Sequence, residues 1–521
     1  MYACPYAPRI SIFRRNWIAW ADLWNNSGHR FKVMLRTLRI SLAVLCFAGF
    51  CLLFADVSGI LPPRLAILAK MQFVPALLSG SFIIVAVLVA LTLLFGRVYC
   101  STICPLGVLQ DVISRLGKKR RFRFHKGYLW LRVGTLAVFL LAFLGGLSIL
   151  VSLLEPYSAF GRIAAGLLAP VWQFGSNLLA LASEHAGSFI VSPSPVWQKG
   201  FSTLAAAAAT LGVISVLAIH SGRTWCNTLC PVGTCLGFLH CFALFRPRID
   251  PEKCTRCGVC AKGCKASCID AGSMVMDASR CVACFNCLRD CPKQAIYYAP
   301  SRRVDLSTAR ENTAGTDCGR RAFFLAGLSV ASLPAIAAAE NAGGKPLNLS
   351  RRQRTPRETP ITPPGSSGRR HFMKRCTGCQ LCVSSCPNQV LSAVDYGANI
   401  LLPAMSFERG FCRVNCVTCS AVCPTGAIRP ITIEQKTTIQ AGRAVIDAKR
   451  CLVTADEIQC TACSRICPTG AAALVGGNDG RPQKLAVDAE RCLGCGACEY
   501  VCPVRPLAAI RVAGNIEHQR I

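Results

Sequence analysis

The stretch Cys254-Thr-Arg-Cys257-Gly-Val-Cys260-Ala-Lys-Gly-Cys264 is followed by Cys281-Val-Ala-Cys284-Phe-Asn-Cys287-Leu-Arg-Asp-Cys291-Pro292. Each run has the spacing Cys-x2-Cys-x2-Cys-x3-Cys, which is typical of segments that ligate two [4Fe–4S] clusters, with the fourth Cys of each run serving the other cluster. The spacing predicts one cluster on Cys254, Cys257, Cys260 and Cys291, and a second on Cys281, Cys284, Cys287 and Cys264. Lys265 departs from the pattern, because Pro usually follows the fourth Cys.

The same pattern returns twice. The predicted ligand sets are Cys376, Cys379 and Cys382 with Cys423; Cys412, Cys416 and Cys419 with Cys386; Cys451, Cys460 and Cys463 with Cys502; and Cys492, Cys495 and Cys498 with Cys467. With the first segment they predict six clusters on 24 of the 35 Cys residues. The wide gap before Cys460 makes Cys451 the least typical ligand. Zinc is the alternative, but structural zinc sites use two Cys pairs or Cys with His, and no His lies in these runs.

The N-terminal half is strongly apolar. Hydrophobic residues make up 52% of the chain and the mean hydropathy is +0.40. Stretches at about 38–54, 73–95, 129–154 and 201–220 approach or exceed the ~20 residues that cross a bilayer. A fifth stretch, 159–182, contains Arg162, Gln173 and Asn177, and we interpret it as an interfacial or re-entrant helix.

The charges between these stretches predict their orientation. The N-terminal arm and the loop after the second stretch are rich in Lys and Arg, whereas the loops after the first and third stretches contain only Arg64 with Lys70 and Arg162 with Lys199. Because Lys and Arg concentrate on the cytoplasmic side, we expect the N-terminus and the 250–300 segment to be cytoplasmic.

The membrane half contains a duplication. Gly96-Arg-Val-Tyr-Cys100-Ser-Thr-Ile-Cys104-Pro-Leu-Gly107 matches Gly222-Arg-Thr-Trp-Cys226-Asn-Thr-Leu-Cys230-Pro-Val-Gly233. Cys residues at i and i+4 share a helix face. The four thiols could bind a metal, form redox-active disulfides or contact a quinone; the alternative is a repeated packing motif with inert thiols. The remaining seven Cys we interpret as structural: Cys4, Cys46, Cys51, Cys235, Cys241, Cys268 and Cys318.

Other function classes find little support. The net charge of +32 could suggest nucleic acid, but bound clusters with their thiolates carry negative charge that offsets much of it. No Cys-x-x-Cys-His heme motif occurs. We find no convincing nucleotide fingerprint, and no catalytic triad or carboxylate pair can be assigned. The sequence therefore predicts a chain that moves electrons, without heme, nucleotide or nucleic acid.

A possible export signal lies in the middle of the chain. Gly319-Arg320-Arg321-Ala322-Phe323-Phe324-Leu325 precedes an apolar stretch ending at Ala339, the layout of a twin-arginine signal. The alternatives are a fifth membrane span or a surface helix. The predicted organisation is a four-span membrane domain (1–245), a two-cluster ferredoxin domain (250–300), the signal or span (315–340), a basic flexible linker (341–370), and two further α+β two-cluster ferredoxin domains (371–430 and 431–521).

These pieces resemble two protein families of periplasmic nitrate respiration joined end to end. Residues 1–300 resemble NapH, and residues 315–521 resemble NapG, including the widened gap at Cys460. The resemblance implies a menaquinol dehydrogenase in the bacterial inner membrane, with the last two ferredoxin domains in the periplasm feeding a reductase there.

The sequence is therefore compatible with three functions. The first is a relay from the menaquinol pool, in which quinol is oxidised near the duplicated Cys motifs. The second is an electron-donating assembly or maturation factor for a periplasmic metalloenzyme, and the third is a scaffold subunit of a larger respiratory complex. Quinone sites usually need a His or carboxylate near the bilayer interface, and the candidates are Asp56, Glu155, His185 and His220.

Overall fold

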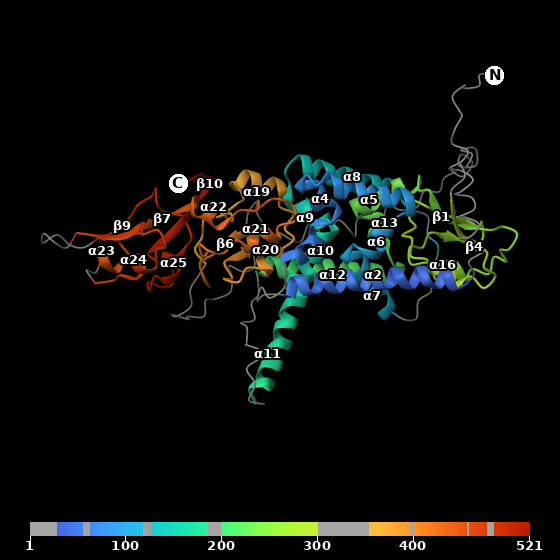
Figure 1. Ribbon diagram of the computed structural model, residues 1–521, viewed down its shortest axis with the longest axis horizontal. Coiled ribbons are helices and arrows are strands. Elements are labelled where there is room, and N and C mark those ends of the chain that lie inside the picture. Colours follow the sequence, from blue (N-terminus) through green and yellow to red (C-terminus); the bar gives the residue numbers. More distant parts are fainter. Residues whose placement is uncertain are drawn as a thin grey trace, which may run out of the picture.

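A computed structural model of the chain describes residues 29–55, 63–117, 122, 124, 127–185, 200–300, 354–395, 400–455, 458–476 and 484–521. The predicted signal at 315–340, most of the linker, Cys4, Cys318 and Asp56 lie outside these residues. In Figure 1 the molecule is elongated, with a helical bundle in the centre and cysteine-rich α+β units at both ends.

The bundle is built from apolar helices. Its elements are α2 (His29–Ala55), η1 (Pro63–Ala66), α3 (Ile67–Lys70), α4 (Phe73–Ser79), α5 (Phe82–Phe95), α6 (Val98–Thr102), α7 (Pro105–Leu116), α8 (Leu129–Leu144), α9 (Ser148–Leu154), α10 (Pro156–Ile163), the π-helical η2 (Ala164–Leu168), α11 (Ala169–His185), α12 (Phe201–Ser221), α13 (Thr224–Thr228) and α14 (Pro231–His240). Large apolar side chains such as Leu45, Ile83 and Leu141 remain exposed on its outside, as lipid-facing side chains do.

Two of the four expected spans are broken. Gly80, with φ 76°, separates α4 from α5, and Gly146, with φ 71°, lies between α8 and α9. Glycine adopts this left-handed conformation readily, so it ends one helical segment and redirects the next. Within the described residues, three segments are long and apolar enough to cross a membrane: Val33–Ala55, Pro156–His185 and Phe201–Ser221.

The stretch expected to be interfacial is one continuous helical segment, Pro156–His185. Its first part, α10, is buried and packs against α12 and α7. Its last part, α11, projects from the bundle (Figure 1) and exposes Trp172, Phe174 and Leu178. The segment thus combines a core helix with an apolar arm.

The N-terminal α+β unit follows the bundle directly. It contains β1 (Phe245–Ile249), α15 (Val259–Lys262), β2 (Ile269–Asp270), β3 (Val275–Met276), α16 (Asn286–Asp290) and β4 (Ile296–Pro300). β1 pairs antiparallel with β4, and β2 with β3. The pairing β1–β4 joins the start and end of the unit beside the bundle, where Phe245 stacks on Phe95 with ring centroids 6.0 Å apart.

The C-terminal half forms two units of the same kind. Its elements are α19 (Arg369–Arg375), α20 (Leu381–Ser384), β5 (Leu391–Ala393), β6 (Pro403–Met405), α21 (Thr418–Val422), α22 (Ile433–Thr437), β7 (Ile439–Ile446), α23 (Leu452–Ala455), α24 (Ala462–Ile466), β8 (Ala472–Val475), β9 (Lys484–Val487), α25 (Ala497–Val501) and β10 (Ile510–Arg520). The antiparallel pairs are β5–β6, β7–β10 and β8–β9. The first unit lies against the bundle and the second is distal (Figure 1).

Candidate iron–sulfur sites

The N-terminal unit encloses two cysteine-lined cavities. Site A is a cavity lined by Cys254, Cys257, Cys260 and Cys291. Site B is a cavity lined by Cys264, Cys281, Cys284 and Cys287. Each cavity gathers the four thiols that the spacing assigns to one cluster. Site A is the more accessible of the two, because Cys257 is exposed whereas all four site B thiols are buried.

Site B has a fifth cysteine, Cys268, which we had interpreted as structural. Its Sγ lies 3.5 Å from Cys264 Sγ, and it lines the same cavity. No Cys-x-x-Cys pattern includes Cys268, so its position beside the site could not be predicted from the Cys spacing.

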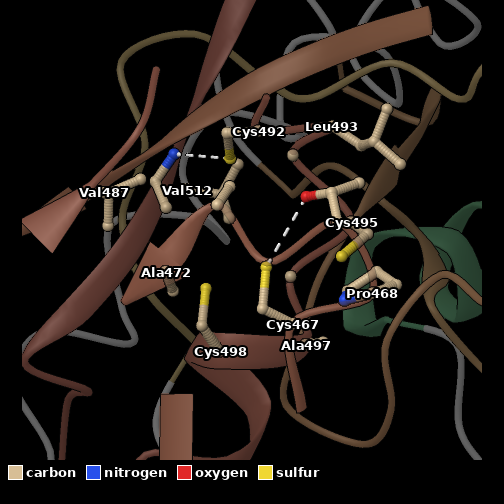
Figure 2. Close-up of a pocket in the computed structure, with 15 residues that line it drawn as sticks. Cys467, Pro468, Ala472, Val487, Cys492, Leu493, Cys495, Ala497, Cys498 and Val512 are labelled. Atoms are coloured by element: carbon tan, nitrogen blue, oxygen red, sulfur yellow. Dashed lines mark hydrogen bonds between the residues drawn. The ribbon is translucent and has the colours of Figure 1, made fainter. Parts of the chain in front are cut away.

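The C-terminal half gathers its thiols into four groups. Site C is Cys376, Cys379, Cys382 and Cys423, whose thiols interact electrostatically. Site D is a cavity lined by Cys386, Cys412, Cys416 and Cys419. Site E is Cys467, Cys492, Cys495 and Cys498, whose sulfur atoms lie around one cavity (Figure 2). Site F is Cys451, Cys460, Cys463 and Cys502, which interact across the widened gap.

The local backbone explains how three thiols wrap each site. In the four runs with regular spacing, the residue after the second Cys is left-handed: Gly258, Phe285, Gln380 and Gly496, with φ between 58° and 77°. Phe285 and Gln380 carry side chains, for which this conformation is unfavourable. In the two runs with a wider first gap, Val417 and Thr461 have φ of −121° and −108°. The longer connection removes the need for the left-handed turn.

The Cys-Pro ends direct backbone donors onto sulfur. The N–H groups of Ala295, Ile428 and Ala509 donate to Cys291, Cys423 and Cys502 Sγ at 3.3, 3.4 and 3.4 Å. Burial raises the pKa of Cys376 to about 12, whereas a coordinating metal deprotonates its thiol ligands outright. Enclosed cavities, four converging thiols and N–H donors together fit a [4Fe–4S] cluster.

Neighbouring sites lie close together within each half of the molecule. In the N-terminal unit, Cys260 of site A interacts with Cys287 of site B. In the C-terminal half, Cys382 of site C interacts with Cys419 of site D, and Cys412 of site D with Cys495 of site E. Cys463 of site F in turn lies beside Cys498 of site E. Sites C, D, E and F therefore form a linear order.

Site B docks on the bundle through buried charges. Asp111 of α7 accepts ion pairs from Arg223 at 2.8 Å, Lys265 at 3.1 Å and Arg39 at 3.6 Å. Burial alone would raise the pKa of Asp111, but these cations, Arg223 foremost, hold it below its ordinary value. Lys265 is the residue that replaces Pro after Cys264, so this departure from the motif provides a docking contact.

Site C docks on the opposite end through close backbone packing. A Cβ added at Gly161 of α10 would overlap the carbonyl oxygen of Cys379. Around Gly161, Phe160 packs against Phe47, Phe50 and Phe54. The site B and site C units lie at opposite ends of the bundle (Figure 1).

A buried polar group lies beside site C. Glu155, 1% exposed, caps the N-terminus of α10 by accepting hydrogen bonds from the N–H groups of Tyr157 and Ser158. Arg162 donates to Ser152 O and Oγ at 2.7 and 2.6 Å. Tyr157 interacts electrostatically with Cys379 and Glu155, so an acid, a phenol and a guanidinium are buried together beside this site.

Two family models match the chain. One is described as a 4Fe-4S binding domain and matches residues 79–123 and 203–249, the two copies of the membrane repeat. The other, a 4Fe-4S dicluster domain, matches residues 375–427 and 458–505. No solved structure matches the chain.

Curated relatives agree with these models. The chain is 31% identical over 170 residues to the methylamine utilization ferredoxin-type protein MauM of Methylobacillus flagellatus, covering 32% of this chain and 72% of MauM. The chain belongs to the ferredoxin-type iron–sulfur protein family. It is also 24% identical over 220 residues to the putative electron transport protein YccM of Escherichia coli, covering 42% of this chain but only 55% of YccM. The ferredoxin-type protein NapF of the same species is 28% identical over 155 residues, 29% of this chain and 84% of NapF.

This ferredoxin-type chain is thus a multidomain iron–sulfur electron-transfer protein with apolar helices compatible with membrane association. Of the candidate quinone-site residues, Glu155 is buried beside site C, whereas His185 and His220 are exposed. Sequence reasoning did not identify the docking roles of Asp111, Arg223 and Gly161.

Proposed function

We propose that the chain is a membrane-bound relay that takes electrons from menaquinol and delivers them to a periplasmic reductase. Sites A to F would hold six [4Fe–4S] clusters, each on the four Cys named above. When bound, these clusters supply one-electron carriers. Oxidation of one menaquinol to menaquinone releases two electrons to these carriers and two protons to solvent.

The observation that carries this proposal is the linear order of sites C to F. Site C contacts the apolar bundle through Cys379 and Gly161, and site F lies in the unit farthest from the bundle (Figure 1). A row that begins at the membrane domain and ends distally suits transfer from a lipid-soluble donor to a partner in solution. The NapH-like and NapG-like halves, with an export signal between them, would place sites C to F in the periplasm.

We place quinol oxidation at the bundle end that faces site C. Glu155 is the buried carboxylate there, and an acid in an apolar setting is a typical functional group of membrane proteins. Its carboxylate would accept a hydrogen bond from a quinol hydroxyl, and the aromatic side chains of Phe47, Phe50 and Phe54 would line the approach. The first of the duplicated Cys motifs, near which the sequence led us to expect the oxidation, is close to this position, because Tyr99 interacts electrostatically with both Glu155 and Cys104.

The test is electron paramagnetic resonance of the full-length, detergent-solubilised protein titrated with a menaquinol analogue. We expect cubane signals on reduction, and loss of that response in Glu155→Gln, whereas dithionite still reduces the variant. The matched control is Glu184→Gln, an exposed carboxylate farther along the same helical segment. Clusters that dithionite reduces but menaquinol leaves oxidised in the native protein would contradict the relay and favour an assembly role.

A further inference from the structure

A buried lysine lies beside site D. Lys436 of α22 is 6% exposed, although Lys side chains are almost never fully buried unless they are paired. Its ammonium group donates to the carbonyl oxygen of Arg413 at 2.6 Å and to that of Cys416. It also forms a hydrogen bond with the side chain of Cys412. The partners of this buried cation therefore all lie in the segment 412–416 of site D.

The charge of Lys436 is not offset by an acid. None of the ion pairs between described residues includes Lys436. An ammonium group has three donors, and the two carbonyl oxygens and the Cys412 sulfur account for three contacts. Lys436 also interacts electrostatically with Cys419 of site D. Burial raises the pKa of Cys412 and the charge of Lys436 opposes that rise, so the cation favours negative charge at this site.

Local sequence fixes the position of Lys436. Thr432 and Gln435 form a capping box at the start of α22, in which the N–H of Gln435 donates to Thr432 Oγ1 at 3.2 Å and the N–H of Thr432 donates to Gln435 Oε1 at 3.1 Å. Such a box satisfies two helix donors that would otherwise lack partners. In the facing segment, the N–H of Cys416 donates to Arg413 O at 3.3 Å and closes a turn. Lys436 thus contacts the turn that the widened gap before Cys416 creates.

Site C has a different electrostatic environment from site D. Glu155 and Arg162, which carry opposite charges, both interact electrostatically with Cys379. Their effects on site C therefore offset each other in part, whereas Lys436 acts on site D without a paired acid. Reduction of a [4Fe–4S] cluster adds one negative charge, and its potential depends on local charge and on hydrogen bonds to the sulfurs. A cation that contacts a ligand sulfur therefore favours the reduced state.

We propose that Lys436 raises the reduction potential of site D above that of site C, so that an electron passes from site C to site D. The step is the transfer of one electron, in which site C is oxidised and site D is reduced, with no change of bonds or protons. Lys436 is a positioning residue, because it acts through Cys412. The inference deepens the proposed relay and rests on clusters at these two sites, whose Cys lie in the segment 375–427 matched by the dicluster model. Lys436 itself lies outside both segments that this model matches.

The contact with Cys412 also bears on the next transfer. Cys412 interacts electrostatically with Cys495 of site E, and its N–H donates to the carbonyl oxygen of Cys495 at 3.0 Å. Lys436 therefore contacts the thiol of site D that adjoins site E. Its charge favours the electron at the position from which transfer to site E begins.

The test is a potentiometric titration of the full-length, detergent-solubilised protein with dithionite and mediators, followed by electron paramagnetic resonance. In Lys436→Gln, whose amide can still donate to the turn but has no charge, we expect the ratio of reduced to oxidised form of one cluster to fall about tenfold at a fixed ambient potential. This corresponds to about 59 mV for a one-electron carrier. Lys436→Arg keeps the charge and should keep the native midpoints. The control is Lys374→Gln, an exposed lysine two residues before Cys376 of site C, which should move no midpoint because water and salt screen its charge.

Native midpoints in Lys436→Gln, with native iron content, would show that Lys436 only supports the turn and would overturn the proposal. Equal shifts in Lys436→Gln and Lys436→Arg would also overturn it, because charge would not be the cause. If Lys436→Gln loses iron, pulsed electron paramagnetic resonance of the native protein labelled with nitrogen-15 lysine decides. A nitrogen-15 coupling in the signals that appear first on reduction supports the proposal, and a coupling that appears only after the other signals, or none, rejects it. None of these readouts uses quinol, so failure of the relay and failure of this inference are distinguishable.

Discussion

The two ends of the helical bundle hold cysteine-rich units by different physical means. At the end facing site B, Asp111 binds Arg39, Arg223 and Lys265, all buried. At the end facing site C, Gly161 lets the Cys379 backbone approach a helix surrounded by Phe side chains. Charge fixes the first interface, and shape fixes the second.

This difference bears on how each unit reaches its place. The site B unit follows α14 directly and is one continuous segment with the bundle, so buried ion pairs can form as the chain folds. In the chain, the site C unit is separated from the bundle by the site B unit and by residues 301–353, which lie outside the described structure. The site C interface is mainly close apolar packing. It includes few charged contacts, of which one is Arg375 donating to Leu78 O at 3.2 Å. Such an interface suits a unit that folds separately and then docks.

Among substitutions that test this difference between the two interfaces, we expect Asp111→Asn to lower the free energy of unfolding most. The substitution leaves three buried cations without their shared anion, and breaking a buried ion pair costs about 3–5 kcal/mol. We expect the free energy of unfolding in detergent to fall by about this amount, with release of the site B unit first. Asp250→Asn is the control, because Asp250 pairs with the exposed Lys253 and such surface pairs contribute at most about 1 kcal/mol.

A second, smaller effect is expected at the opposite end from Gly161→Val. The new side chain would overlap the Cys379 carbonyl oxygen, and overpacking costs about 1–3 kcal/mol. Menaquinol-dependent reduction of the site C to F clusters should slow roughly tenfold, measured by stopped-flow absorbance.

The matched change is Gly175→Val on α11, where an added Cβ meets nothing within 4 Å. If both variants keep the native rate, the Gly161 contact does not carry electrons into site C. Unfolding free energy should stay close to native in Gly175→Val, which separates local overpacking from a general effect of valine.

The smallest effect is expected from Lys265→Met. Met keeps the length of the side chain but removes one of the three cations around Asp111, while Arg39 and Arg223 remain. The lost charge-assisted contact should lower the unfolding free energy by about 1 kcal/mol, measured as for Asp111→Asn. A loss as large as that of Asp111→Asn would show that the three cations do not share the anion as the geometry indicates.

Much of this architecture follows from local sequence patterns. The Cys runs predicted which thiols gather at each site, including the exchange of the fourth Cys, because two-residue gaps allow three thiols to wrap one cavity. The apolar stretches marked the bundle, but not the breaks at Gly80 and Gly146, since a single glycine inside an apolar run is compatible with an intact helix. Cys268, Lys265 and Gly161 owe their positions to contacts between segments far apart in sequence, and no local pattern encodes such contacts.

The contact between Arg97 of the first repeat and residues of the second repeat has a consequence for biosynthesis. Arg97 finds its partners Asn227 and Cys226 about 130 residues later in the chain. Until residues 226 and 227 have been synthesised, Arg97 lacks these two acceptors, so the first repeat can reach its final packing only after the second repeat has formed. A chain truncated between the two repeats would lack the acceptors that hold Arg97 in its buried position.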